Sequence, residues 1–345
     1  MHGVSDDDYV MRAIVYTQNL PVSDPESLID VDLPRPSPRG RDLLIEVVAV
    51  SVNPVDVKQR AASPAPLGGR ILGYDGAGIV RETGSDVGMF EVGDEVYWAG
   101  QINRPGSDAQ FQLVDERIVG HKPRTIDFAD AAALPLTTIT AWELLFDRLG
   151  LTADSTGHLL VVGATGGVGS MVVQLTRALA PEVTIVATAS TPEGANWVLE
   201  LGADQVVDHR RGLLEQVGSV APGGIDWIFS SHTEGQIDTY ASILRPFGQI
   251  AAIDDPQTLD IVPLKSKSIA FHWEFMFTRP VRKTPDMVAQ HELLDQVATL
   301  VDAGRIVSTA TTRLAPLDAE RLRDAHGLVE TGRTIGKVVL SGWPA

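Results

Sequence analysis

The sequence predicts an α/β protein in which a β-rich unit precedes a doubly wound parallel sheet. Two observations support this fold class. Residues 11–120 contain short apolar runs separated by Pro and Gly clusters, which is typical of a compact, mainly β unit. From about residue 135 onward, apolar strand-like runs alternate with segments of helical period. That alternation is typical of parallel strands joined by right-handed crossovers.

The predicted elements follow one another in a regular order. A strand begins near Met11, after a polar extension over residues 1–9. Apolar residues three and four apart predict a helix from Ile139 to Leu149, which ends at Gly150. The wound sheet is predicted as strand 158–163, helix 168–179, strand 184–189, helix 192–201, strand 205–208, a helix after Arg211, strand 226–231, helix 234–244 and strand 248–253. A strand-like run over 268–277, a helix within 284–304 and a strand over 335–340 complete the chain.

Length and composition exclude several classes of function. A chain of 345 residues fits two domains, and its formal charge of −17 opposes binding to nucleic acid or to an anionic membrane. The chain has no cysteine, so it can form no disulfide, no catalytic thiolate and no zinc site built from thiolates. Residues 1–9 lack the apolar segment of a signal peptide, and no run is long enough to span a membrane. We therefore expect a cytoplasmic protein.

A glycine-rich turn lies between the first strand of the predicted wound sheet and its helix. Glycine permits a tight turn there and lets backbone N–H groups approach a pyrophosphate, whose charge the helix N-terminus stabilises. A tight turn without a ligand is the alternative, but the strand and helix context favours dinucleotide binding. The residues expected at the cofactor are Gly163, Thr165, Gly166, Gly167 and Val168.

The end of the second strand indicates which dinucleotide is bound. NAD-binding proteins usually place a carboxylate there, whereas this chain has Ser190 and Thr191. The next strand is followed by His209 and Arg210, which can add positive charge near a 2′-phosphate, although a solvated loop is the alternative. The prediction is NADP(H). A longer second strand would place Glu193 at the acidic position instead.

Several segments together resemble the medium-chain dehydrogenase/reductase superfamily, within it the quinone-oxidoreductase-like branch and most closely the zinc-type alcohol dehydrogenase-like proteins. They are SVNPVD at 51–56, GYDGAG at 73–78, GDEV at 93–96, LPLTTITAW at 134–142, the glycine-rich turn and HWEFMF at 272–277. The resemblance implies a GroES-like catalytic domain over 11–134, a Rossmann NADP(H)-binding domain over 135–277, and a C-terminal segment over 278–345 that completes the catalytic domain.

The family name suggests zinc, but the residues at the corresponding positions argue against it. Asn53 stands where the resemblance implies a zinc cysteine, and Tyr74 and Asp75 stand where it implies a histidine and a glutamate. Without a Lewis acid, an acceptor that delocalises the developing charge is favoured. We therefore predict zinc-independent hydride transfer from NADPH to a quinone or an α,β-unsaturated carbonyl. The alternatives are a zinc-dependent alcohol dehydrogenase or carbonyl reductase, and a non-catalytic NADPH-binding protein.

Three residues are candidates for catalysis on the basis of this resemblance. Asn53 can donate an amide hydrogen to the substrate oxygen or can turn the chain before a proline. Tyr74 can donate its phenolic hydrogen or can simply pack beneath the site. His272 is a candidate general acid or a structural histidine. Asp56 and Asp75 can hold turns or pair with a basic residue.

The resemblance also suggests cofactor contacts outside the glycine-rich turn. Thr138 corresponds to a residue that touches the cofactor, and Lys337 corresponds to a basic position near the cofactor phosphates, although an edge-strand lysine is the alternative. Tyr97 and Trp98 are candidates for an aromatic acceptor wall or for the core. The strand-like run from residue 268, paired edge to edge across a two-fold axis, would give a homodimer.

Overall fold

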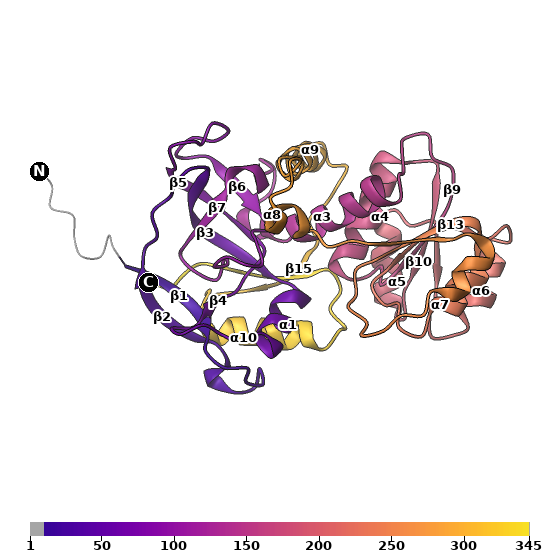
Figure 1. The fold of residues 1–345 in the computed structure, drawn as a ribbon, viewed down its shortest axis with the longest axis horizontal. Helices are drawn as coiled ribbons and strands as arrows, with labels where there is room; N and C mark the ends of the chain where they lie inside the picture. The colour runs from indigo at the N-terminus through magenta and orange to yellow at the C-terminus, as the bar shows by residue number, and fades with distance from the viewer. Residues whose placement is uncertain (1–9, 345) are drawn as a thin grey trace, which may run out of the picture. The chain divides into compact units, whose positions relative to one another are not determined.

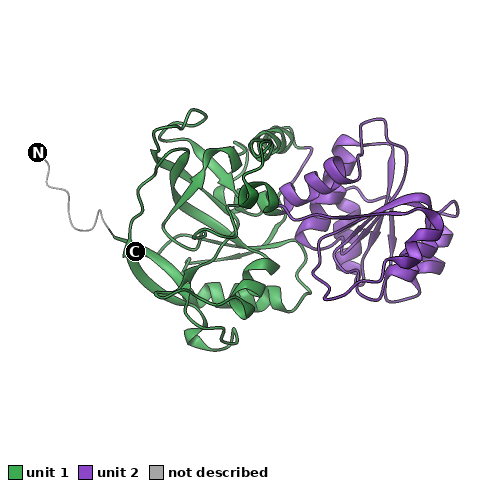
Figure 2. Cartoon of the chain, in the orientation of Figure 1, with its two compact units in different colours: residues 1–136, 277–304, 308–345 green, residues 137–276, 305–307 purple. Residues whose placement is uncertain are grey.

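A computed structural model describes residues 10–344, so the predicted N-terminal extension over residues 1–9 lies outside the described range. The chain divides into two compact units (Figure 2). Unit 1 contains the residues up to Leu136, the segment Phe277–Gly304 and the residues from Ser308 onward. Unit 2 contains Thr137–Met276 and Arg305–Val307.

Unit 2 is the doubly wound domain that the sequence predicts. Its six strands are all parallel and lie in the order β11-β10-β9-β12-β13-β14. Helices connect strands that follow one another along the chain (Figure 1). The elements are β9 (Gly157–Val162), α4 (Gly167–Leu179), β10 (Val183–Thr188), α5 (Pro192–Glu200), β11 (Gln205–Val207), α6 (Leu213–Val220), β12 (Ile225–Ser230), α7 (Ile237–Ile243), β13 (Leu244–Ala252), the 3-10 helix η5 (Val262–Lys267) and β14 (Ala270–Trp273).

The strand order of unit 2 places a ligand crevice at a defined point. The chain winds from β9 outward to β11, then returns to the other side of β9 to form β12. In such sheets a ligand binds beyond the carboxyl ends of the strands, at the point where the winding direction reverses. The glycine-rich turn follows β9 and therefore lies at that point.

Unit 1 is built from β-sheets, as predicted. A seven-stranded sheet has the order β15-β16-β3-β5-β6-β8 with β7 paired to β3, and a three-stranded sheet has the order β2-β1-β4. Its elements are β1 (Val10–Tyr16), η2 (Pro25–Ser27), β2 (Ile29–Pro34), β3 (Asp42–Val52), α1 (Pro54–Ala62), β4 (Arg70–Ile71), β5 (Gly76–Thr83), β6 (Glu95–Trp98), β7 (Phe111–Asp115), η3 (Glu116–Ile118), β8 (Val119–His121), α2 (Phe128–Ala132), α8 (Thr278–Arg282), α9 (Ala289–Asp302), β15 (Ala310–Leu314), α10 (Ala319–Glu330) and β16 (Lys337–Ser341).

The predicted helix from Ile139 to Leu149 has two parts in the structure. Helix α3 (Pro135–Trp142) begins at a proline, whose fixed φ suits a first helical turn, and continues as the π-helix η4 (Glu143–Arg148). The boundary between the two units falls within α3, after Leu136.

Several elements differ from the sequence prediction. The helices α1 and α10 were not expected, and β14 covers only four residues of the strand-like run over 268–277. The two aromatic residues on β6 are fully buried in unit 1, where the Tyr97 hydroxyl donates to the Leu294 carbonyl oxygen at 2.6 Å and Trp98 Nε1 donates to Gln112 Oε1 at 2.7 Å. Of the two alternatives left open for these rings, a wall for the acceptor or part of the core, the structure favours the core. None of the helices between residues 10 and 344 is long and apolar enough to cross a membrane.

Candidate active site

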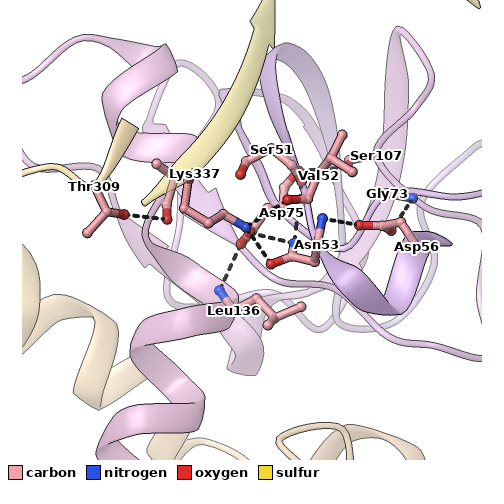
Figure 3. Close-up of polar contacts among 11 residues, drawn as sticks. Ser51, Val52, Asn53, Asp56, Gly73, Asp75, Ser107, Leu136, Thr309 and Lys337 are labelled. Carbon is pink, nitrogen blue, oxygen red and sulfur yellow. Dashed lines mark hydrogen bonds and ion pairs between the residues drawn. The ribbon is translucent and has the colours of Figure 1, made fainter. Parts of the chain in front are cut away.

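Unit 1 holds a buried polar network formed by Asn53, Asp75 and Lys337 (Figure 3). Lys337 Nζ donates to Asp75 Oδ2 at 3.0 Å, to the Val52 carbonyl oxygen at 3.1 Å and to Asn53 Oδ1. Asn53 Nδ2 in turn donates to Asp75 Oδ2 at 2.8 Å. The exposed fractions are 1% for Asn53, 0% for Asp75 and 4% for Lys337, so water does not compete for these bonds.

The second oxygen of Asp75 reaches a helix N-terminus. Asp75 Oδ1 accepts from the backbone N–H of Leu136 at 2.8 Å, in the first turn of α3. A carboxylate is favourable there because the first N–H groups of a helix have no partner within the helix. Burial raises the pKa of Asp75, and the Lys337 ammonium acts in the opposite direction. The Asp75 carboxyl accepts hydrogen bonds from Asn53, Leu136 and Lys337, as suits its ionised form.

Asp56 lies beside this network at the start of α1. Asn53 is the N-cap residue, and its backbone N–H donates to Asp56 Oδ2 at 2.7 Å. Asp56 Oδ1 accepts from the Gly73 N–H at 3.2 Å. Burial raises the pKa of Asp56 to about 7, an effect that the nearby Lys337 ammonium and these backbone donors only partly offset. Asp56 is thus a buried carboxyl that changes charge near neutral pH.

Tyr74 is buried, with an exposed fraction of 1%. Its hydroxyl oxygen accepts from Arg70 Nη2 at 3.1 Å, which leaves the hydroxyl hydrogen free to point elsewhere. The ring packs edge-on against Phe277 at a centroid distance of 5.3 Å. Burial, together with the nearby Asp56, raises the pKa of Tyr74 well above its usual value. The phenol therefore stays protonated and remains a hydrogen-bond donor across the physiological range.

The glycine-rich turn of unit 2 has the geometry of a dinucleotide site. At Gly169 a Cβ would lie 2.3 Å from the Gly163 carbonyl oxygen, so the close approach of turn and helix requires glycine. At Gly166, the N-cap of α4, the nearest atom to a Cβ would be 3.6 Å away. The protein itself therefore tolerates a side chain at Gly166, and the open space there suits a pyrophosphate approaching the helix N-terminus. These features fit a nicotinamide dinucleotide.

Thr138 supplies a second sign of a ligand in unit 2. It is fully buried in α3, and within the described residues its hydroxyl has no hydrogen-bond partner. A buried hydroxyl without a partner is costly unless a ligand or water satisfies it. A cofactor contact for Thr138 remains a prediction, and this orphaned group is compatible with it.

The end of β10, the second strand of unit 2, carries hydroxyl groups and lies near two arginines. β10 ends at Thr188, and Glu193 lies in the first turn of α5, so no carboxylate occupies the end of the strand. The Thr191 hydroxyl caps α5 by accepting from the Gly194 N–H at 3.1 Å. Arg210 donates to the Ser190 carbonyl oxygen and to Asp208, and His209 is exposed beside it. Since Asp208 also pairs with Arg211, the two guanidinium groups share one carboxylate and leave net positive charge.

His272 lies on β14 in unit 2. Its Nε2 is 3.0 Å from Gln249 Oε1, and Gln249 Nε2 donates to the Leu149 carbonyl oxygen at 3.2 Å. That amide orientation requires the hydrogen of a neutral imidazole to be on Nε2. Burial and the nearby Arg148 lower the pKa of His272 below its usual value. A neutral imidazole at pH 7 is poorly suited to act as a general acid, so the geometry favours the structural alternative.

The hydrogen-bonding groups of Lys337 and Asn53 are already engaged within unit 1. Lys337 is placed in the buried network of unit 1, where three acceptors match its three ammonium hydrogens, so its contact with cofactor phosphates stays a prediction without support here. Asn53 directs its amide hydrogens to Asp75 and to the Ser51 carbonyl oxygen, so donation to a substrate would require it to exchange one of those bonds. The pairing of Asp75 with a basic residue was one of the alternatives left open by the sequence.

The donor set of this network does not suit zinc. Among residues 10–344 no group of three or more histidine or carboxylate side chains is arranged to hold a metal ion. At the position corresponding to the zinc ligands the side chains are an amide, a phenol and a carboxylate, and that carboxylate already faces an ammonium at 3.0 Å. Zinc sites use imidazole, thiolate and carboxylate ligands, and a fixed cation at this distance would repel the metal.

We predict that the Asp56 carboxyl titrates near pH 7. Its pKa of about 7 in the fold exceeds the unfolded value of ~3.9, so the folded state binds this proton more tightly. Its contribution to stability is therefore full below about pH 4 and is lost as the pH rises through 7. Infrared difference spectra between the wild type and Asp56→Asn should show a protonated carboxyl band at about pH 5 that is gone at about pH 9. Absence of the band at the lower pH would contradict the assignment.

Comparison with known proteins agrees with the fold. Residues 39–124 match the alcohol dehydrogenase GroES-like domain, and residues 201–340 match the zinc-binding dehydrogenase family. A zinc-type alcohol dehydrogenase-like protein of Staphylococcus aureus is 38% identical over 317 residues, which is 89% of this chain and 92% of the relative. The 2-methylene-furan-3-one reductase of Solanum lycopersicum is 30% identical over 323 residues, which is 90% of this chain and 74% of the relative's length.

A solved structure is also closely similar. The crystal structure of a Rhizobium etli protein described as a zinc-dependent alcohol dehydrogenase superposes with a TM-score of 0.94 at 48% identity, covering 98% of this chain and 99% of the other. Identity at this level over nearly the whole of both chains establishes the family as well as the fold. The chain is an oxidoreductase of the medium-chain dehydrogenase/reductase family and belongs with its zinc-type alcohol dehydrogenase-like members.

Proposed function

We propose that the protein is a zinc-independent reductase that transfers a hydride from NADPH to a quinone or an α,β-unsaturated carbonyl compound. The observation that carries this proposal is the buried network of Asn53, Asp75 and Lys337, in which an ammonium is the cation beside the carboxylate. The family description names zinc, but an ammonium already occupies the cation position beside this carboxylate, so the network does not need a metal ion to balance its charge.

The preferred acceptor follows from the charge that the reaction creates. NADPH supplies a hydride when it is bound, and the accepting molecule gains negative charge on oxygen. Zinc dehydrogenases stabilise that charge by Lewis acidity. Without zinc, a conjugated acceptor lowers the demand on the protein because the charge spreads into an enolate or a hydroquinone. The named substrate of the tomato relative, a ketone with a methylene group on the neighbouring ring carbon, is a compound of this class.

Tyr74 is the residue that we propose as hydrogen-bond donor to the acceptor oxygen. Its hydroxyl oxygen is held by Arg70, and burial keeps the hydroxyl protonated, so the group can donate its hydrogen at any physiological pH. A donor aimed at the position where charge develops stabilises the transition state more than the ground state. Asn53, whose amide hydrogens already have acceptors, is the weaker candidate for this role.

The choice of NADPH over NADH rests on charge at the end of β10. A carboxylate at that position would repel a 2′-phosphate, and the first acidic residue beyond β10 is Glu193, five residues after its end and inside α5. Ser190 and Thr191 offer hydroxyl groups there, and the Arg210 guanidinium lies against the Ser190 backbone. These groups favour a phosphate over a free ribose hydroxyl.

We further propose that the protein is a homodimer that pairs through β14. This strand is at the edge of the six-stranded sheet and presents Trp273, which is 49% exposed and packs edge-on against Phe271 at 4.9 Å. An edge strand with an exposed aromatic side chain favours pairing with another copy.

We expect purified protein to oxidise NADPH with an ortho-quinone or a simple enone while a chelator is present throughout. Parallel assays with NADH should give lower kcat/KM, because Ser190 and Arg210 favour the 2′-phosphate. Turnover that appears only after zinc is added would identify a zinc-dependent dehydrogenase instead. NADPH binding without turnover on any acceptor would favour the non-catalytic alternative.

Substitution of Gly166 tests the cofactor site apart from turnover. The Cβ of Gly166→Ala meets nothing closer than 3.6 Å within the protein, so thermal stability should fall only by the small cost of alanine at an N-cap. NADPH binding should weaken by roughly tenfold or more where the pyrophosphate approaches. Gly169→Ala is the matched comparison, because its Cβ would lie 2.3 Å from a backbone oxygen and should destabilise unit 2 itself. Equal NADPH affinity in Gly166→Ala and the wild type would contradict this placement of the cofactor.

The dimer is tested by mass in solution. Sedimentation should give about twice the chain mass of 37.0 kDa. Trp273→Asp should shift the population toward the monomer, because it places a charge on the exposed edge, whereas Leu67→Asp, at a fully exposed position in unit 1, should not. A wild-type protein that sediments as a monomer at micromolar concentration would refute the proposal.

A further inference from the structure

The Lys337 ammonium is enclosed by three oxygen atoms that belong to three separate groups. They are the Val52 carbonyl oxygen, Asn53 Oδ1 and Asp75 Oδ2, and each accepts one hydrogen bond from Nζ (Figure 3). An ammonium has three hydrogens and no acceptor, so this set uses all of them. The side chain therefore has no hydrogen left for a substrate or a phosphate, and its effect on any reaction must pass through its partners.

Lys337 determines how the Asn53 amide is oriented. Because the ammonium can only donate, the amide oxygen must face Lys337 and the amide nitrogen must face Asp75. The opposite orientation would bring two donors together and leave the carboxylate facing an oxygen. The ammonium thus selects one of the two amide orientations, and Asn53 is also the N-cap of α1.

Lys337 also determines the state of Asp75, which connects to the first turn of α3. Asp75 is fully buried, and an isolated carboxylate in such a place would take up a proton rather than remain charged. The ammonium at 3.0 Å and the Asn53 amide at 2.8 Å offset that cost. The ionised carboxylate then holds the Leu136 N–H at 2.8 Å, two residues before Thr138 in the same helix.

The backbone brings these distant residues together and leaves little freedom. Lys337 opens β16, which pairs antiparallel with β3 so that Val338 lies opposite Val52. The Lys337 backbone N–H donates to the Thr309 carbonyl oxygen at 2.8 Å, and Asp75 receives a further restraint through its own carbonyl oxygen, which accepts from Ser107 Oγ at 2.8 Å. Both charged side chains are therefore held at their backbone ends as well as at their tips.

We propose that Lys337 is the resident cation of unit 1, a positioning residue whose ammonium takes the place of a metal ion. It holds Asn53 and Asp75 in one arrangement and thereby anchors the first turn of α3. The effect of Lys337 on turnover rests on the proposed reductase function, whereas its effect on the first turn of α3 does not. The disagreement between the family description and this donor set is then explained, because the position of the metal charge is filled by a side chain of the chain itself.

The test that does not require turnover is hydrogen exchange. In Lys337→Met the Asp75 carboxylate loses its counter-ion, so the peptide covering residues 134–142 should exchange faster than in the wild type while peptides of unit 2 beyond α4 stay unchanged. A further infrared band of a protonated carboxyl, additional to the Asp56 band that the wild type also shows, should appear at neutral pH and should be absent from the Asp75→Asn/Lys337→Met double variant. Lys265→Met, at an exposed lysine of unit 2, is the matched control and should change neither signal.

Chemical rescue separates a missing cation from a damaged fold. Lys337→Ala leaves three converging oxygens without their donor, so methylammonium should restore slow exchange over residues 134–142. Tetramethylammonium has no hydrogen to donate and should not. If the wild type reduces a quinone or enone, Lys337→Met should lose roughly ten- to a hundredfold in kcat/KM, and methylammonium should recover part of the loss in Lys337→Ala. Lys337→Arg should retain more activity than Lys337→Met because it keeps the charge.

Three results would overturn the proposal. The first is wild-type exchange over residues 134–142 in Lys337→Met, together with an Asp75 carboxyl that remains ionised. The second is a large loss of NADPH affinity in Lys337→Met without any change in exchange, which would indicate a phosphate contact instead. The third applies if Lys337→Met does not fold. The double variant Asp75→Asn/Lys337→Met has no unpaired buried charge at this site, so it should be more stable than Lys337→Met. A double variant as unstable as Lys337→Met would show that the two residues are not coupled. Failure of turnover in the wild type, by contrast, would affect only the proposed function.

Discussion

The ion pair between Lys337 and Asp75 is the constraint on which the arrangement of the polar network in unit 1 depends. Burying two charges costs more than their attraction returns unless further hydrogen bonds satisfy both groups, and here each group has them. The pair therefore requires that β16, the end of β3, the loop before β5 and the start of α3 all stay in register. A buried charged network of this kind contributes little net stability, but it penalises every arrangement in which one partner is lost.

The proposed chemistry draws on cofactor-binding features of unit 2 and on hydrogen-bonding groups of unit 1. Unit 2 contributes a glycine-rich turn, an open helix N-terminus and a strand end without a carboxylate, which together suit a phosphorylated dinucleotide. Unit 1 contributes the protonated phenol of Tyr74 and the Asp56 carboxyl, whose pKa burial raises to about 7. It also contributes a polar network in which the Lys337 ammonium is the cation. Under the proposed function, unit 1 offers hydrogen bonds in place of a Lewis acid, so a conjugated acceptor that shares its developing charge is the substrate class that we propose.

Features that depend on neighbouring residues could be predicted from the sequence, and features that depend on distant ones could not. The alternation of strands and helices in unit 2 and the turn at Gly163–Gly169 are local patterns, and both are confirmed. Helix α1 was missed because it lies among Pro and Gly clusters, although Asn53, Pro54 and Asp56 form a capping signature that could have indicated it. The contact between Lys337 and Asp75 joins residues 262 positions apart through the pairing of β16 with β3, so no local pattern reports it.

The most direct test of the central claim follows the hydride itself. NADPH carrying deuterium at the transferable position of the nicotinamide would be incubated with the protein, a chelator and an enone, and the product analysed by nuclear magnetic resonance. Zinc-free reduction of a conjugated acceptor predicts deuterium on the carbon β to a carbonyl that remains intact. Deuterium on a newly formed carbinol carbon would show direct carbonyl reduction and would contradict the account.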